Sequence, residues 1–175
     1  MRIPDELRSA LRTQLWQKAD ELTWNRLTWL DKTRWYETWT KDPEIGGRLA
    51  NHLDHQRIRL YIKDTVMKGY VRTRQADPCR PLNSLGIDPS TPFTEDYERP
   101  HGRRLADGRL IVWGNADDWK LVLTALHERS YGSVHIRPFA AVLMLAAGKY
   151  DQPSTRDMVH DAAAKLGIEK VIWLA

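Results

Sequence analysis

Residues 57–63 alternate strictly between apolar and polar side chains, and this pattern constrains the fold more than any other feature of the chain. Ile58, Leu60 and Ile62 occupy every second position of the segment. Because successive side chains of a strand point to opposite faces of a sheet, such alternation is typical of a half-buried strand. The sequence therefore predicts a strand here, which residues 66–72 either continue or pair with.

The polar face of the predicted strand combines cations with an aromatic ring, and residues 68–72 repeat that composition. Cations neutralise phosphates, and a tyrosine ring can stack on a base, so this face is a candidate surface for nucleic acid. An ordinary solvated sheet face is the alternative, and the pattern does not distinguish DNA from RNA. The predicted binding residues, including two from a second basic cluster, are Arg57, Arg59, Tyr61, Lys63, Lys68, Tyr70, Arg72, Arg103 and Arg104.

The positive charge of the chain is concentrated in a short window. The 175 residues carry a net charge of +4, which is modest by itself. Between Arg57 and Arg80, however, seven basic residues face two acidic ones, and Arg99–Arg109 holds four basic residues and one acidic residue. This distribution, more than the total, favours a polyanionic partner over a neutral one.

The remaining patterns predict an α+β fold, with a small antiparallel or mixed sheet packed by about five helices. Strands are expected at 109–113 and 171–174, and Pro138 to Ala147 is expected to be a buried helix. Amphipathic helices are expected at 5–22, from Asp31 as N-cap, from Asp42-Pro43 to about 53, from Asn115, and at 154–166. We expect one domain, with a Trp-rich helical part at 1–54 and a mixed part at 55–175 that contains a Pro-rich loop at 76–100.

The chain has eight tryptophans, and five of them lie before residue 40. Tryptophan is favoured at interface hot spots, so the N-terminal region is a candidate docking surface for a protein partner. The alternative is that these rings fill the core of a small helical layer. The five residues are Trp16, Trp24, Trp29, Trp35 and Trp39.

Two clusters are candidate metal or catalytic sites. Asp107, followed by Asp118-Trp119-Lys120, has the approximate order of the acids and lysine of a Mg²⁺-dependent nuclease. Asp107, Asp117 and Asp118 nevertheless lie at turn and cap positions, which explain them without a metal. His52, Asp54 and His55, with Asp64, resemble metal ligands. On a helix His52 and His55 could share a face, but Asp54 would point elsewhere, and surface or helix-end polar residues are the alternative. We therefore predict no catalytic residue, no metal and no cofactor.

The sequence favours a chain of the cytoplasm that does not engage a membrane. No apolar run approaches the roughly 18 residues that a membrane span needs, and no apolar signal segment opens the sequence. The single cysteine, Cys79, cannot form an internal disulfide, which suits a reducing compartment. The preferred hypothesis is a nucleic-acid-binding, non-catalytic subunit of a larger complex. The alternatives are a small Mg²⁺-dependent nuclease and a protein–protein adaptor with a Trp-rich docking surface.

Overall fold

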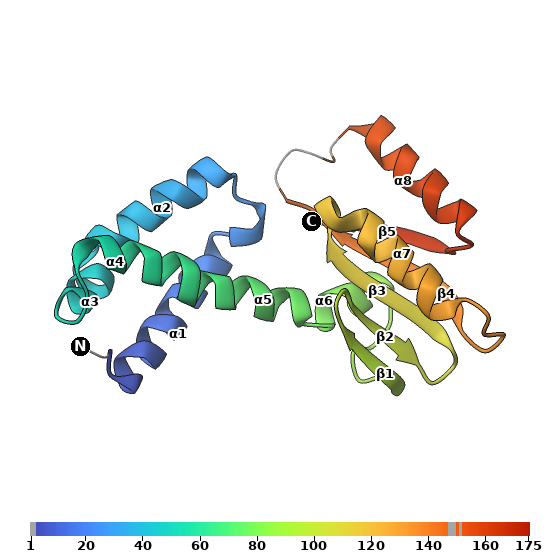
Figure 1. Ribbon diagram of the computed structural model, residues 1–175, viewed down its shortest axis with the longest axis horizontal. Coiled ribbons are helices and arrows are strands. Elements are labelled where there is room, and N and C mark those ends of the chain that lie inside the picture. The colour runs from blue at the N-terminus through green and yellow to red at the C-terminus, as the bar shows by residue number, and fades with distance from the viewer. Residues whose placement is uncertain (1–2, 147–149, 151) are drawn as a thin grey trace. The chain divides into compact units, whose positions relative to one another are not determined.

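The protein has an α+β fold, as the sequence predicts (Figure 1). The structure is a computed structural model that describes residues 3–146, 150 and 152–175. Its residues group into two compact units, Met1–Arg74 and Gln75–Ala175, and each is described by itself. The expectation of a single domain, with a helical part that ends at residue 54, stays a prediction.

The N-terminal unit is helical. A long continuous helix runs from His55 to Ala76, and it changes from α to π geometry and back along its length. Its three segments are α4 (His55–Leu60), the π-helical η3 (Tyr61–Met67) and α5 (Lys68–Ala76). The elements before it are α1 (Asp5–Glu21), η1 (Trp24–Arg26), α2 (Trp29–Lys41), the π turn η2 (Pro43–Gly47) and α3 (Arg48–Ala50).

The predicted strand at 57–63 is therefore wrong, because this segment is helical. Ile58 and Ile62 are buried in the core of the unit, as both a strand and a helix would allow at a spacing of four. Leu60 distinguishes the two structures: a strand would place it on the same face as Ile58 and Ile62, whereas it is 51% exposed. The buried set continues at Val66 and Tyr70, which gives a helical stripe with a four-residue step.

Local capping explains where two of the helices begin. The Thr28 side chain accepts a hydrogen bond from the backbone N–H of Asp31 at 3.1 Å, so Thr28 is the N-cap of α2. The prediction of Asp31 as N-cap is wrong by three positions; its carboxylate instead accepts from the Thr28 hydroxyl at 2.5 Å. Asp42 is confirmed as a cap, since its carboxylate accepts from the Glu44 N–H at 2.8 Å and Pro43 follows in the first turn.

Tryptophan rings form much of the core of the N-terminal unit. Trp24 and Trp39 are each 1% exposed and stack with ring centroids 5.0 Å apart. Trp16 and Trp35 pack against this core and are partly buried. Trp29 differs from the other four N-terminal tryptophans, because 78% of its surface is exposed. For Trp24 and Trp39 the core interpretation of the sequence is therefore confirmed.

The C-terminal unit contains a five-stranded mixed sheet whose strands lie in sequence order. The first three strands form an antiparallel meander, and the last two are parallel to the third. The expected strands at 109–113 and 171–174 are confirmed within β3 and β5. The strands are β1 (Phe93–Glu98), β2 (His101–Leu105), β3 (Arg109–Asn115), β4 (Arg137–Met144) and β5 (Lys170–Leu174).

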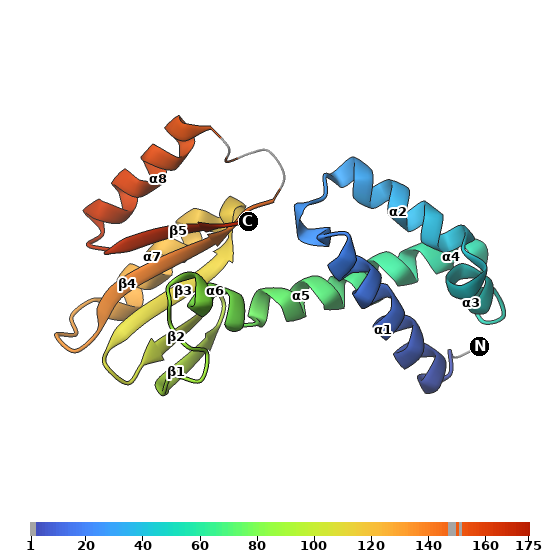
Figure 2. The ribbon, with the colours of Figure 1, turned by 180° about the vertical axis from the view of Figure 1, so that it is seen from behind.

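Helices cover both faces of this sheet. Helices α7 (Trp119–Ser130) and α8 (Pro153–Lys165) connect the parallel strands and share one core with Leu110 and Val112 of β3 (Figure 2). Helix α6 (Cys79–Ser84) contributes Leu82 to the core on the opposite face. The short η4 (Ala116–Asp118) leads into α7, and the Asn115 side chain makes no capping hydrogen bond. No helix in the described part of the chain is long and apolar enough to cross a membrane.

Two further predictions about the C-terminal unit are corrected. Pro138 to Ala147 was expected to be helical, but Arg137–Met144 is the buried strand β4, and Ala147 lies outside the described residues. A strand buried on both faces has a continuous apolar run that resembles a buried helix. The Pro-rich loop at 76–100 contains α6 and β1. Pro81 is tolerated because it lies in the first turn of α6, where backbone N–H groups have no helical partner.

Candidate functional site

The nine predicted binding residues do not lie on one sheet face. Seven belong to the helix His55–Ala76 of the N-terminal unit, and Arg103 and Arg104 belong to β2 of the C-terminal unit. Around the helix they point in several directions. Tyr70 is buried, Arg59 and Tyr61 are half-buried, and the exposed members are Arg57, Lys63, Lys68 and Arg72.

Tyr70 is a core residue with its polar group already engaged. Its hydroxyl donates to Asp20 Oδ1 at 2.8 Å, and Arg74 binds the same carboxylate. Burial, followed by the hydrogen bond to Asp20, raises the pKa of Tyr70 to about 12. The ring also meets Trp16 edge-on, with centroids 6.0 Å apart. Tyr70 is therefore not accessible for stacking on a base.

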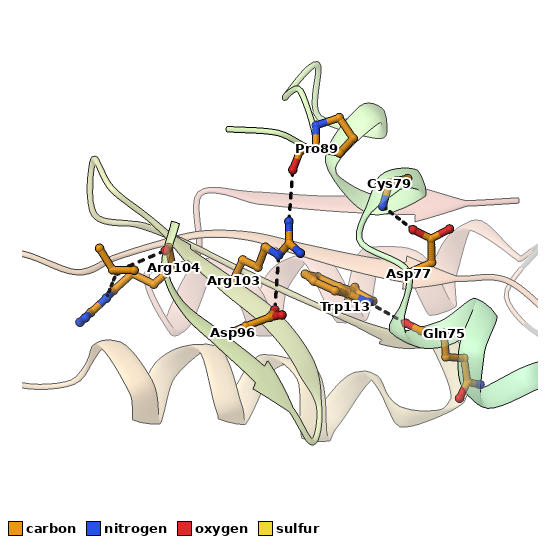
Figure 3. A network of polar contacts seen from close by, with 9 residues as sticks. Gln75, Asp77, Cys79, Pro89, Asp96, Arg103, Arg104 and Trp113 are labelled. Carbon is orange, nitrogen blue, oxygen red and sulfur yellow. Dashed lines mark hydrogen bonds and ion pairs between the residues drawn. The ribbon is translucent and has the colours of Figure 1, made fainter. Parts of the chain in front are cut away.

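Arg103 and Arg104 are held by the neighbouring strand (Figure 3). Arg103 donates to Asp96 Oδ1 at 3.3 Å and to the Pro89 carbonyl at 3.2 Å, and its side chain is 13% exposed. Arg104 lies 2.6 Å from Glu95 Oε1. Both carboxylates belong to β1, which pairs with β2 in register, so each cation faces an acid across the strands. Much of the charge of this cluster is thus neutralised within the sheet.

The N-terminal unit has a groove between α1 and the long helix, with a volume of about 400 Å³. We call this hollow the α1 groove. Figure 1 shows that α1 crosses the long helix near the middle of that helix. Helix α1 lines it with Asp5, Arg8, Ser9, Arg12 and Trp16, and the long helix lines it with Tyr61, Thr65, Val66, Gly69 and Thr73.

Two guanidinium groups lie in the α1 groove. Arg8 is 3.4 Å from Asp5 and donates to the Ile3 carbonyl at 3.2 Å, which leaves its side chain 40% exposed. The Arg12 guanidinium lies 5.7 Å from the centre of the Trp16 ring, and it forms no ion pair with any residue that the structure describes. Burial raises the pKa of Tyr61, and the charges of Arg8 and Arg12 oppose that rise, so both cations act on the phenol.

The Trp16 ring is fixed in position and exposed toward the groove. Its indole N–H donates to the Val66 carbonyl at 3.2 Å, which joins α1 to the long helix. Gly69 lies beside the ring, and a Cβ atom at this position would be 3.8 Å from Trp16 Cζ2. That distance is an ordinary van der Waals contact, so a side chain at position 69 would cover the ring edge that glycine leaves open.

The helix geometry explains why one row of residues faces the groove. Tyr61, Thr65, Gly69 and Thr73 recur at a spacing of four. A π segment closes with i→i+5 hydrogen bonds and so has more residues per turn than the 3.6 of an α-helix. Because the long helix includes the π segment η3, its residues at a spacing of four lie closer to one line along the helix axis than they would in a regular α-helix. Segments of π-helix are also frequent at functional sites.

A second hollow, of about 390 Å³, lies between α2 and α4. Arg59 and the exposed Leu60 line it, together with Glu37 and Lys41. Arg59 and Tyr61 are only two positions apart in sequence, but they line different hollows because they lie on different sides of the helix. The hollow also contains an acid, which offsets its cations.

Two observations bear on the predicted metal cluster and on Asp107 of the nuclease alternative. Among the residues that the structure describes, no three His, Cys, Asp or Glu side chains are arranged to hold a metal ion. The Asp107 carboxylate accepts from the backbone N–H of Arg109 at 3.0 Å and from its Nε at 2.8 Å. These bonds lower the pKa of Asp107, first through the backbone N–H, and they account for the residue as part of a turn.

Sequence reasoning missed Arg8 and Arg12, and it assigned Trp16 to a protein-docking surface or a helical core instead of a site shared with them. The three residues follow one another at a spacing of four along α1, which places them in one row of the helix. This row of two arginines and a tryptophan was the available signal, but the same pattern also fits the polar side of an ordinary amphipathic helix.

We found no protein-family model that matches the chain, and no curated protein or solved structure with significant similarity to it.

Proposed function

We propose that the protein binds nucleic acid through the α1 groove, without catalysing a reaction on it. The observation that carries this proposal is the combination of Arg8 and Arg12 with the rings of Trp16 and Tyr61 around one hollow. Guanidinium groups bind phosphate oxygens, and aromatic rings stack on bases for about 1–3 kcal/mol each.

The charge distribution also favours the N-terminal unit as the part of the chain that binds nucleic acid. Met1–Arg74 holds fifteen basic and ten acidic residues, a net charge of +5. Gln75–Ala175 holds twelve basic and thirteen acidic residues, a net charge of −1. A polyanion is therefore attracted to the N-terminal unit, and the exposed Lys68 and Arg72 add to this attraction on the long helix.

The test is the salt dependence of oligonucleotide binding in two matched double variants. Arg8→Gln with Arg12→Gln removes two charges inside the groove, and Arg59→Gln with Lys63→Gln removes two charges elsewhere in the same unit. Each phosphate contact on a single strand contributes about 0.7 to the slope of log K against log salt. The groove variant should bind at least about tenfold more weakly, with a slope reduced by about 1.4.

The control variant should lose no more than about threefold in affinity, since its cations lie outside the groove. Far-ultraviolet circular dichroism should show that both variants are folded. Equal losses in the two variants would mean that the groove has no special role. Wild-type protein that binds no oligonucleotide at low salt would refute the proposal itself.

The protein–protein adaptor remains a second candidate because of one observation. Trp29 is 78% exposed and Leu30 is 52% exposed, at adjacent positions in the first turn of α2. Contiguous apolar patches at the surface mark docking sites, and tryptophan is enriched among interface hot spots. If the chain is a subunit of a complex, Trp29→Ser should weaken association with the partner in a pull-down assay. The same variant should leave oligonucleotide binding unchanged in an anisotropy assay.

A further inference from the structure

We propose that the α1 groove accommodates an unpaired base, so that the nucleic acid bound is single-stranded. This inference rests on the proposed function and adds the class of ligand to it. The groove has the volume of a small-ligand pocket, which spans about 300–1,000 Å³ in general. An extended chain of nucleotides can place one base in such a hollow while its phosphates remain at the rim.

A duplex cannot use the groove in the same way. In a duplex the bases stay stacked and paired, and a protein reads them by inserting a helix or strand into a groove of the nucleic acid. Here Trp16 and Tyr61 line a hollow of the protein. The arginines can still meet the phosphates of a duplex, but the two rings cannot stack on its bases. Single strands offer both parts of the ligand at once.

Gly69 is the second observation that points to a base. Glycine in the middle of a helix lowers the stability of that helix, so its presence needs a reason. Close packing is not the reason, because the nearest atom to an added Cβ is Trp16 Cζ2 at 3.8 Å. The absent side chain instead leaves the Trp16 ring accessible from the groove. A flat base lying across Gly69 would contact that ring.

The polar side chains of the groove suit a ligand whose sequence varies. Ser9, Thr65 and Thr73 provide hydroxyl groups, each of which can donate or accept a hydrogen bond. Stacking and hydroxyl contacts tolerate any base, because every base has an aromatic face and polar edges. We therefore infer that the groove binds single strands with little sequence preference.

The experiment compares four ligands by fluorescence anisotropy: a labelled single-stranded DNA of twelve nucleotides, the RNA of the same sequence, the DNA duplex of the same sequence, and unlabelled adenosine monophosphate as competitor. The proteins are wild type, Gly69→Leu, which fills the groove beside Trp16, and Ala10→Leu, a control on the exposed part of α1 outside the groove. The wild type should bind at least one of the single strands tenfold more tightly than the duplex. Gly69→Leu should lose at least tenfold on the single strand and less than threefold on the duplex, and Ala10→Leu should match the wild type.

Each contrary result has a distinct meaning. Equal binding of duplex and single strand, or an unchanged affinity in Gly69→Leu, would overturn the inference, while a loss in the Arg8→Gln, Arg12→Gln variant would still support the proposed function. Adenosine monophosphate that competes as well as an unlabelled oligonucleotide would identify a small-molecule site and overturn the inference. No binding of any ligand by the wild type would overturn both. Circular dichroism and urea unfolding of Gly69→Leu should show that its fold is retained.

Discussion

The indole N–H of Trp16 donates a hydrogen bond to the backbone carbonyl of Val66, fifty positions later in the chain, at 3.2 Å. This bond joins α1 to the π segment of the long helix, and it fixes the ring that forms one side of the α1 groove. Val66 itself is 4% exposed and belongs to the core. The groove is therefore built on two packed helices, and its shape depends on the same contacts that stabilise the N-terminal unit.

Gly69→Ala should stabilise the protein, because alanine favours a helix and the added methyl group has room. We expect a gain of about 0.5–1 kcal/mol in the free energy of unfolding, measured by urea denaturation. Gly46→Ala is the matched opposite. A Cβ at position 46 would lie 1.8 Å from the Thr40 carbonyl oxygen, so this variant should lose more than about 2 kcal/mol. Destabilisation by Gly69→Ala would contradict the open space beside Trp16.

A pair of substitutions distinguishes the observed helix from the strand that the sequence suggests. Ile62 is fully buried, so Ile62→Asp should bury an unpaired charge and cost about 3 kcal/mol or more. Leu60 is half exposed, so Leu60→Asp should cost less than about 1 kcal/mol. In a strand both side chains would point to the same face. Similar losses in the two variants, measured by urea denaturation, would therefore favour the strand.

The helices at either end of the chain and two strands were predictable from sequence, because each rests on local information. The stripe of α1, the Asp42-Pro43 cap and the apolar segment of β5 identify their elements without reference to the rest of the fold. The segment 57–63 failed for a definite reason. Within these seven residues, Ile58 and Ile62 fit both the two-residue period of a strand and the four-residue step of a helix. Only Leu60 distinguishes the two structures, because a strand would bury it and the helix exposes it.

The candidate site required tertiary information. Arg8, Arg12 and Trp16 become a site only when Tyr61 and Gly69 lie opposite them, and that pairing of helices is not encoded in local spacing. Arg103 and Arg104 are predicted nucleic-acid-binding residues, and the structure pairs them with Asp96 and Glu95 of β1. Those acids lie within residues 76–100, which the sequence predicts to be a Pro-rich loop. β1 is rich in acids and lies between Pro92 and Pro100, so the pattern did not indicate the strand that holds the partners of the second basic cluster.

Alkaline pH should destabilise the N-terminal unit through Tyr36. Burial, with a contribution from Asp64, raises the pKa of Tyr36 from about 10 to about 12. A raised pKa means that the folded state retains the proton longer, so the stabilisation is complete below pH 10 and is lost as the pH rises through 12. Between pH 8 and pH 11, Tyr36→Phe should lose less stability than the wild type. Equal losses in urea titrations at the two pH values would refute this assignment.

Photocrosslinking tests directly whether nucleic acid lies in the α1 groove. A single-stranded oligonucleotide with one 5-bromouracil, irradiated with the wild-type protein and digested, should yield adducts that mass spectrometry assigns to Trp16 or Tyr61. Gly69→Leu should lose these adducts, because the base no longer reaches the rings. Adducts confined to the β2 segment around Arg103 and Arg104, with none in the N-terminal unit, would contradict the account.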